Sequence, residues 1–379
     1  MMKNSLFAIL ALCLSSLAQS QTKTAGAGSQ YDGINHILIA GDGEVTYFRD
    51  QDNSSFTELN FKPIFLWHIS DKLFVESEVE IETGEGEASL GLEYLNMCYF
   101  VNPYLTLHAG RFLPKFGAYR GRMAEGFLNR LPTDPIGFGD GGIGASIETG
   151  IGVLGGLPIG NGRLNYDFYL SNGPHLLTDS ANAGQFDYEA YIGNNKSVAT
   201  GGRIGILPIS DQSLEIGYSF LAKKNTSDQA AVDHASVFMQ AVDFNFYHVI
   251  TQIRGTIRVM GEWRHQKVGN VTYYKGVDDW GHPSEPYNVS GNPPTCYYDL
   301  GSLRLSQLSN LILRNFEIAF RYSHYQRPSD APWAEGLGET NRTTVGIDYW
   351  LHWNSLLKLA YQVEKNTPHG YYAQLVFGF

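Results

Sequence analysis

The chain has 379 residues, of which 43% are hydrophobic and 13% aromatic, and it carries a formal net charge of -11. An acidic chain with a sequence pI near 5.4 is a poor nucleic-acid binder, because affinity for the phosphate backbone depends on clustered lysine and arginine. No proline- or serine-rich linker divides the sequence, and beyond the N-terminus no run of about 18 apolar residues predicts a membrane-spanning helix. We therefore expect one large domain rather than two or three soluble ones.

The first residues, MMKNSLFAILALCLSSLAQSQ, have the features of an export signal. Lys3 supplies the positive region, residues 5–14 form a short apolar core, and Ala18 ends a small-residue cleavage motif before Gln19. The sequence thus predicts a signal peptide at residues 1–18, a flexible segment at residues 19–33 and an exported domain at residues 34–379.

Most of the remaining chain alternates apolar and polar residues, which is the period of a β-strand. In residues 356–365, Leu357 and Leu359 alternate with Lys358 and Ala360. The chain ends on Phe379, and an apolar terminal strand makes sense if it closes a barrel whose apolar row faces lipid. The pattern predicts strands near residues 34–50, 55–69, 72–83, 86–101, 103–112, 142–156, 162–171, 196–209, 212–222, 233–247, 249–266, 296–308, 313–326, 342–353, 355–365 and 370–379.

These strands number about sixteen, and single-chain bacterial barrels have an even number. Their connections alternate between tight turns, as at residues 69–71 and 353–355, and long loops, as at residues 113–141 and 267–295. Short turns belong on the periplasmic side and long loops outside, which puts both termini in the periplasm. We predict an all-β fold, a transmembrane antiparallel β-barrel of about 16 strands in the bacterial outer membrane. Its longest early connection follows the fifth strand and is the candidate for a pore-constricting loop, as considered below.

Several predicted strands carry charged side chains on the face opposite their apolar row. Glutamates alternate with other residues over 76–82, and arginines recur over 254–264. So many charges need water inside the barrel, whereas the core of a soluble sandwich could not bury them unpaired. We predict that the pore is lined by Glu76, Glu78, Glu80, Arg254, Arg258, Glu262, Arg264, Arg321 and Lys358.

The long loop at residues 113–141 is the strongest functional candidate, because loops of this length in a compact domain are usually functional. Its charged residues are Lys115, Arg120, Arg122 and Arg130, with Arg111 at its root, and Glu125, Asp134 and Asp140. Two interpretations remain open: an extracellular loop with ordinary surface charges, or a loop folded into the lumen that narrows it. In the second interpretation the five basic residues form the pore constriction.

Other motifs give weaker signals. Residues 150–155 match GxGxxG, but no helical period follows them, so a dinucleotide site is not expected. The 11 histidines show no zinc-ligand spacing and no GxSxG motif occurs, so we expect no metal, no cofactor and no catalytic residue. The strand count places Cys98 and Cys296 at opposite ends of the barrel, too far apart for a disulfide.

Residues 110–117, reading GRFLPKFG, resemble the GRF…PFG stretch of the phosphate-selective porin family of bacterial outer membranes. The similarity extends weakly over residues 40–379 through strand number, short turns and the terminal aromatic residue. The resemblance implies a sixteen-stranded barrel, usually trimeric, in which the loop after the fifth strand lies in the pore and basic residues guide anions. Carried over to this chain, it makes Arg111, Lys115, Arg120 and Arg122 candidate constriction residues.

The sequence therefore predicts an outer-membrane porin for passive diffusion of small hydrophilic solutes, with a weak anion preference that could extend to phosphate. Its expected partners are outer-membrane lipid, the barrel-assembly machinery acting through Phe379, further copies in a homotrimer, and small anions or other small hydrophilic solutes. Two alternatives remain open: an outer-membrane β-barrel enzyme such as a lipase-like hydrolase, and a secreted glycan-binding β-sandwich. Detergent dependence would separate barrel from sandwich, and permeation without turnover would separate porin from enzyme.

Overall fold

The computed structural model describes residues 36–84, 87–123, 125–139, 142–177, 184–188, 197–226, 235–269, 271–274, 286–288, 294–328, 338–365 and 367–379. The predicted signal peptide at residues 1–18, the segment at residues 19–33 and Asp140 lie outside these residues. Residues Ile37–Phe379 form one compact unit. No helix in the described part of the chain is long and apolar enough to cross a membrane.

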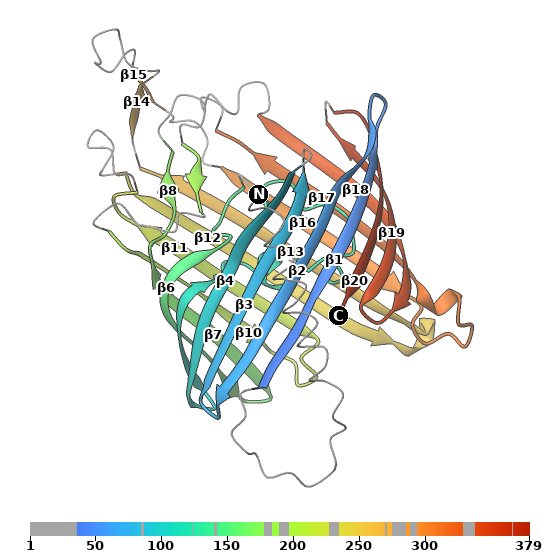
Figure 1. Ribbon diagram of the computed structural model, residues 1–379, viewed down its shortest axis with the longest axis horizontal. Helices are drawn as coiled ribbons and strands as arrows, with labels where there is room; N and C mark the ends of the chain where they lie inside the picture. Colours follow the sequence, from blue (N-terminus) through green and yellow to red (C-terminus); the bar gives the residue numbers. More distant parts are fainter. Residues whose placement is uncertain are drawn as a thin grey trace, which may run out of the picture. The chain divides into compact units, whose positions relative to one another are not determined.

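Sixteen antiparallel strands, each paired with the strand before and after it, close into a barrel (Figure 1). Alternating apolar and polar residues commit each segment to an extended conformation with two distinct faces. The predicted fold class and strand number are confirmed. The strands are β1 (His36–Arg49), β2 (Ser54–Ser70), β3 (Leu73–Gly84), β4 (Glu87–Asn102), β5 (Leu105–Phe112), β6 (Glu148–Ile159), β7 (Gly162–Ser171), β10 (Ala199–Leu207), β11 (Leu214–Lys223), β12 (Val237–Ile250), β13 (Gly255–Val268), β16 (Thr295–Arg304), β17 (Phe316–Gln326), β18 (Glu339–His352), β19 (Ser355–Glu364) and β20 (Gly370–Gly378).

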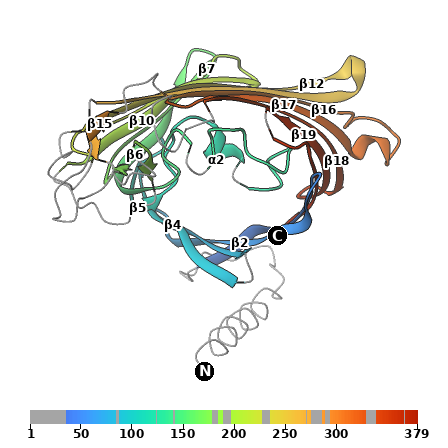
Figure 2. The ribbon, with the colours of Figure 1, turned by 90° about the horizontal axis from the view of Figure 1, so that it is seen from above.

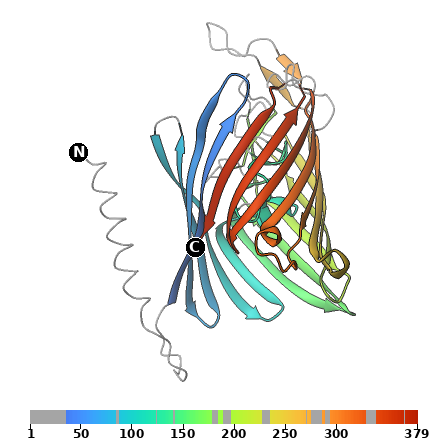
Figure 3. The same ribbon diagram turned by 90° about the vertical axis from the view of Figure 1, so that its right-hand side faces the viewer.

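The barrel closes where β20 pairs with β1, and the chain's C-terminus lies beside the first strands (Figure 3). The backbone N–H of Phe379 donates to the carbonyl of Gly41 at 3.0 Å, and its ring stacks on Phe61 with 5.3 Å between centroids. Gly41 has a φ of 142°, and a Cβ there would overlap the carbonyl of Lys62, so the position requires glycine. The last residue of the chain is thus part of the closing contact.

The two faces of the wall are built from alternate residues of each strand. On β19, Leu359 is 53% exposed on the outside, whereas the neighbouring Lys358 is 1% exposed on the inside. On β17, Ile318 and Phe320 are exposed while Arg321 is fully buried. An apolar outside and a charged inside are the reverse of a water-soluble protein and match a barrel surrounded by lipid.

One strand begins later than the alternation suggests. The sequence predicts a strand from residue 142, but β6 begins at Glu148. Residues 142–147 instead belong to the preceding loop, where the amide of Ile143 donates to the carbonyl of Gly137 at 2.9 Å. A local turn therefore takes the backbone hydrogen bonds that a strand would have used.

Another strand ends earlier than predicted. The alternation suggests a strand to residue 308, but β16 ends at Arg304. Oδ1 of Asn310 accepts the amides of Ile312 and Leu313 at 3.0 and 3.1 Å and starts the short 3₁₀ helix η2 (Leu313–Asn315). Beyond Arg304 the backbone amides bond elsewhere, that of Gln307 to the carbonyl of Arg254 at 3.0 Å and that of Leu308 to the carbonyl of Leu305 at 3.1 Å. Strand pairing therefore stops at Arg304, and a longer connection follows at residues 305–315.

Between β5 and β6 the chain turns into the barrel. Residues 113–147, here called the inward loop, contain the short helix α2 (Tyr119–Met123), which lies inside the ring of strands (Figure 2). Two small sheets add to the connections at the same end, β8 (His175–Leu176) with β9 (Phe186–Asp187) and β14 (Thr272–Tyr274) with β15 (Pro286–Asn288). We call this end the loop end, and the opposite one, with the shorter connections, the turn end.

The cysteines in the described chain are free thiols. Cys98 lies toward the turn end of β4 and Cys296 at the loop end of β16, and both are buried. The Cys296 thiol donates to the carbonyl of Gly137 in the inward loop at 3.3 Å.

Candidate functional site

The inward loop packs an apolar face against one side of the barrel wall. Leu131 and Ile143 of the loop are buried in one cluster with Met260 of β13, Tyr298 of β16 and Ala319 of β17. Apolar side chains in this loop would otherwise be exposed to water, so their burial holds the loop inside the barrel. The interpretation as an ordinary extracellular loop is therefore wrong, and the predicted loop inside the lumen is confirmed.

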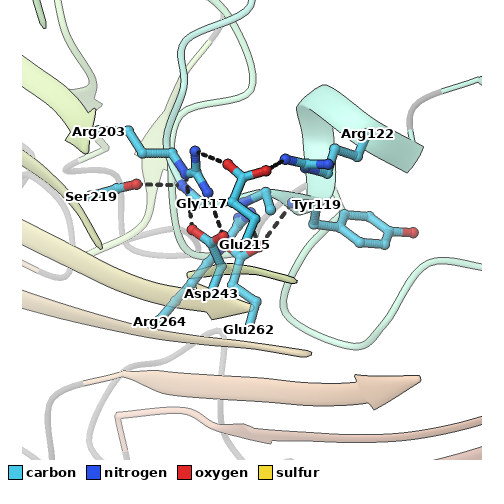
Figure 4. Close-up of polar contacts among 10 residues, drawn as sticks. Gly117, Tyr119, Arg122, Arg203, Glu215, Ser219, Asp243, Glu262 and Arg264 are labelled. Atoms are coloured by element: carbon cyan, nitrogen blue, oxygen red, sulfur yellow. Dashed lines mark hydrogen bonds and ion pairs between the residues drawn. The ribbon is translucent and has the colours of Figure 1, made fainter. Parts of the chain in front are cut away.

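Glu262 of β13 fixes the start of α2. Its Oε2 accepts the amides of Ala118 and Tyr119, each at 2.8 Å, and its Oε1 accepts Nε of Arg264 at 2.6 Å (Figure 4). These two amides have no partner within the helix, so the carboxylate satisfies groups that would otherwise be buried unpaired. Gly117 has a φ of 71°, and a Cβ there would overlap the Glu262 carboxylate.

Arg264 holds the far end of the inward loop from the same strand. Its Nη1 donates to the carbonyl of Ile143 at 2.6 Å, and its guanidinium lies 4.3 Å from the ring centroid of Phe138. Glu262 and Arg264, both predicted to line the pore, thus bind the loop and each other at buried positions.

A chain of alternating charges joins α2 to three strands. Arg203 of β10 donates to Asp243 of β12 at 2.6 and 3.0 Å and to Glu215 of β11 at 2.9 Å (Figure 4). The other oxygen of Glu215 pairs with Arg122 of α2. Buried charges are stable in such networks because each has an opposite partner within hydrogen-bond distance. Arg122 is therefore held against the wall.

Three more predicted cations hold the loop backbone. Nη1 of Arg321 donates to the carbonyl of Thr133 at 2.5 Å, and Nζ of Lys358 donates to the carbonyl of Gly126 at 2.7 Å. Arg130 of the loop pairs with Glu317 of β17 at 3.1 Å. All three side chains therefore have fixed partners within the protein.

A carboxyl pair holds the loop on the side of β1. The amide of Gly126 donates to Oδ2 of Asp42 at 2.8 Å, and the neighbouring Glu125 carboxyl lies close to Asp42. Burial raises the pKa of Glu125 to about 9, and repulsion from Glu78 and Asp42 adds to the shift. With this raised pKa, Glu125 is protonated at neutral pH and does not repel Asp42.

Two polar cavities lie beside the inward loop. The first, about 560 Å³, lies against β1 to β4 and is called the β1–β4 cavity. Its wall carries more carboxylates than cations, and Lys62 pairs with Glu80 at 2.8 Å. Arg120 of α2 reaches this cavity from the loop. The charged lining residues are Glu44, Glu58, Lys62, Glu80, Glu82, Glu93, Arg120, Asp134 and Lys358.

The second cavity, about 540 Å³, is called the β4–β7 cavity. Lys115 of the loop is exposed there, opposite Asp167 of β7 and His108 of β5. Glu76 lines the same space and accepts Nδ2 of Asn96 at 2.9 Å. Within the described residues neither Lys115 nor Arg120 makes an ion pair, so each presents an unpaired positive charge to its cavity.

The remaining predicted residues lie elsewhere. Arg111 is buried near the end of β5, where its Nε donates to the backbone carbonyl of Glu93 at 2.9 Å, and it lines neither cavity. Arg254 lies in the connection before β13, next to η1 (Thr251–Ile253), rather than on a strand. Glu78 is buried in the wall, and Arg258 lines a third cavity at the turn end.

Sequence reasoning did not single out Arg203, Asp243 or Asp42 as site residues. Each is a charged residue in the inward row of a strand, so the period-two pattern contains the signal. The contacts between β10, β11 and β12 that join them depend on strand register, which one sequence does not give. Within the described residues no group of three His, Cys, Asp or Glu side chains could hold a metal ion.

No family model and no curated protein matches this chain in sequence. Solved structures do match its fold. The outer membrane channel DcaP of Acinetobacter baumannii is 13% identical, with a TM-score of 0.57 over 93% of this chain and 100% of that chain. An anion-selective porin from Comamonas acidovorans is 11% identical, with a TM-score of 0.51 over 91% and 100%.

The trimer form of OmpT, an outer membrane protein of Vibrio cholerae, is 9% identical, with a TM-score of 0.52 over 91% of this chain and 99% of that chain. Identities this low show a common barrel fold and nothing about the solute.

Proposed function

We propose that this chain is an outer-membrane porin through which small hydrophilic solutes diffuse passively. The observation that carries the proposal is the inward loop, which is anchored to strands between β11 and β19 and to Asp42 of β1 and leaves polar cavities of about 560 and 540 Å³ along β1 to β7. A loop that narrows a water-filled barrel without filling it is the arrangement of a diffusion channel. The apolar outer face supports a lipid environment.

We further propose the orientation and assembly that the sequence predicts. The turn end faces the periplasm and the loop end faces outward, so both termini of the mature barrel are periplasmic. Residues 1–18 act as a signal peptide. Phe379 is the feature that the barrel-assembly machinery reads, and the mature chain forms a homotrimer, as OmpT of Vibrio cholerae does in its trimer form.

The proposed selectivity is a weak preference for anions, set by Lys115 and Arg120. The charge of a side chain affects ion selectivity most where the lumen is narrow, because the electric field is concentrated there and dissolved salt screens it least. The opposite wall of the β1–β4 cavity is acidic, so the field crosses the pore and the net preference stays small. The resemblance of residues 110–117 makes phosphate the first specific anion to test.

The test is the reversal potential of the purified channel in a planar bilayer under a potassium chloride gradient. The double variant Lys115→Glu with Arg120→Glu is expected to shift the potential toward cations. The matched control is Lys72→Glu with Lys224→Glu, which makes the same charge change at exposed sites away from the loop. A strongly cation-selective wild type, or equal potentials for both double variants, would show that the loop cations do not set selectivity.

The proposal contains no chemical step. Solutes should equilibrate across proteoliposomes unchanged. Hydrolysis of ester or phospholipid substrates by the purified barrel would favour the lipase-like alternative instead.

A further inference from the structure

A third cavity, of about 710 Å³, lies at the turn end of the barrel. It is formed where β12, β13, β16, β17 and β18 end near the connection at residues 305–315. Four arginines line it: Arg130, Arg258, Arg304 and Arg314. Among its described lining residues, Glu317 is the one carboxylate. We call these four residues the arginine cluster.

The single carboxylate, Glu317, already accepts three hydrogen bonds. Oε1 of Glu317 accepts Nε of Arg130 at 3.1 Å and the hydroxyl of Ser302 at 2.5 Å, and Oε2 accepts Nε1 of Trp350 at 2.9 Å. Glu317 therefore compensates Arg130 and orients Trp350, and it forms no ion pair with Arg258, Arg304 or Arg314.

Arg304 is held in place by neutral groups. Its Nε donates to the backbone carbonyl of Arg314 at 3.0 Å, and its Nη2 donates to Oδ1 of Asn315 at 3.3 Å. Two guanidinium groups also stack on the ring of Trp350. That of Arg304 lies 4.5 Å from the ring centroid, and that of Arg130 lies 4.8 Å from it. These contacts fix the position of the Arg304 charge without neutralising it.

Arg258 has no compensating partner in the described part of the chain either. It faces the cavity from β13, opposite Ser302 of β16 and Tyr247 of β12, and makes no ion pair with any described residue. Asp348, the next carboxylate along the wall, is fully buried opposite Lys358 and does not line the cavity. Four arginines against one carboxylate leave three positive charges around one polar space.

We propose that the arginine cluster is a binding site for a divalent oxyanion group, of the kind carried by sulfate, a phosphate or a dicarboxylate. Guanidinium groups present paired N–H donors that match the spacing of oxyanion oxygens, and two negative charges compensate the excess better than one. The hydroxyls of Thr256 and Ser306, 2.7 Å apart, offer further donors at the rim. The site is separate from Lys115 and Arg120. Its location on the periplasmic side rests on the proposed function.

Sulfate is the probe of choice because its charge does not change between pH 5 and 9. Equilibrium dialysis of the detergent-solubilised barrel with radiolabelled sulfate measures binding without requiring conduction. Arg258→Gln is expected to weaken binding about tenfold, the loss of one hydrogen bond to a charged group. The matched control is Arg163→Gln, which removes the same charge from an exposed site at the turn end of β7. Succinate and inorganic phosphate as competitors identify the preferred oxyanion, and chloride should compete weakly.

In a planar bilayer with oriented channels, sulfate should reduce chloride current when added at the turn end and much less when added at the loop end. This asymmetry should disappear in Arg258→Gln and persist in Arg163→Gln. Absence of sulfate binding in dialysis, or equal binding by the two variants, would overturn the proposal. A barrel that binds sulfate but conducts no ions would instead refute the porin function and leave the site in place.

Discussion

The backbone amide of Tyr119 donates to Oε2 of Glu262 at 2.8 Å, a contact between residues 143 positions apart in the sequence. It joins the middle of the lumen to the barrel wall. Because the same carboxylate also binds Arg264, one buried side chain positions both α2 and a cation that holds the end of the inward loop. The position of the loop therefore depends strongly on Glu262.

Replacing Glu262 with alanine should release the start of the inward loop. The change removes the acceptor of two amides and leaves the buried charge of Arg264 unpaired, which costs roughly 3–5 kcal/mol. The variant barrel should unfold at a lower temperature than the wild-type barrel. Its single-channel current should also be larger and fluctuate more than that of the wild type. Glu82→Ala, at an exposed carboxylate of β3 on the acidic wall, is the control and should keep wild-type heat resistance.

A glycine pair in the same segment offers a matched test. Gly117→Ala forces a left-handed backbone position on an L-residue and places a methyl group against Glu262, at a cost of about 1–3 kcal/mol. Gly121 lies in α2 with open space around its missing Cβ, so Gly121→Ala should be neutral or stabilise by up to roughly 1 kcal/mol. Gly117→Ala should lower the temperature of unfolding, whereas Gly121→Ala should leave it unchanged or raise it. Equal effects would mean that the close approach of Gly117 to Glu262 does not position the loop.

The contact between Glu125 and Asp42 should weaken at high pH. The folded barrel raises the pKa of Glu125 to about 9, while an unfolded glutamate titrates near 4.5. The folded state thus binds more protons between these values, and the stability from this contact falls as the pH rises toward 9. Above pH 9 the two carboxylates repel across the end of the loop, and Lys62 and Lys358 nearby offset only part of the repulsion.

Channel recordings between pH 7 and 10 can measure this effect. Fluctuations of the wild-type current should increase above pH 9. Glu125→Gln cannot ionise and keeps an N–H donor near Asp42, so its current fluctuations should not change over this pH range. The control is Glu339→Gln, at an exposed carboxylate of β18 that lies beside His324 at the loop end of the barrel. Wild-type current fluctuations that stay constant between pH 7 and 10 would contradict a protonated Glu125 at neutral pH.

Phe379 should matter for assembly rather than for selectivity. Its ring stacks on Phe61 and its amide binds Gly41, so Phe379→Asp places a charge at the apolar rim and removes the stacking partner. We expect a lower yield of heat-modifiable barrel and an unchanged reversal potential for the fraction that folds. Phe379→Tyr keeps the ring and should assemble normally. A normal yield for the aspartate variant would show that the terminal ring is dispensable.

Much of the fold could be predicted because a strand of this barrel exposes one row to lipid and one to the lumen. Leu359 and Lys358 are neighbours in sequence and opposites in environment, and that alternation is visible without a structure. Boundaries were less certain where a local hydrogen bond competes with strand pairing. Just beyond β16 the amide of Leu308 bonds locally to the carbonyl of Leu305, and before β6 the loop turn at Ile143 does the same.

The role of each charge was harder to predict, because the period of a strand gives the face of a side chain and not its partner. Arg321 and Lys115 both belong to the predicted basic residues of the lumen. Arg321 is fully buried on the loop backbone, whereas Lys115 is exposed in a cavity. Only the three-dimensional path of the inward loop distinguishes them, and that path depends on long-range contacts such as that of Glu262 with Tyr119.

The contact of β20 with β1 has a consequence for biosynthesis. Nε2 of Gln374 donates to Glu44 and to the hydroxyl of Thr46, both at 3.0 Å, across 330 and 328 positions of sequence. The free edge of β1 therefore cannot be paired until β20 has been translated. Until then both edge strands offer unpaired backbone groups to other chains. A chain truncated before Gly370 would keep β1 open, so a fragment of this protein should depend on chaperones for its solubility rather than fold into a smaller pore.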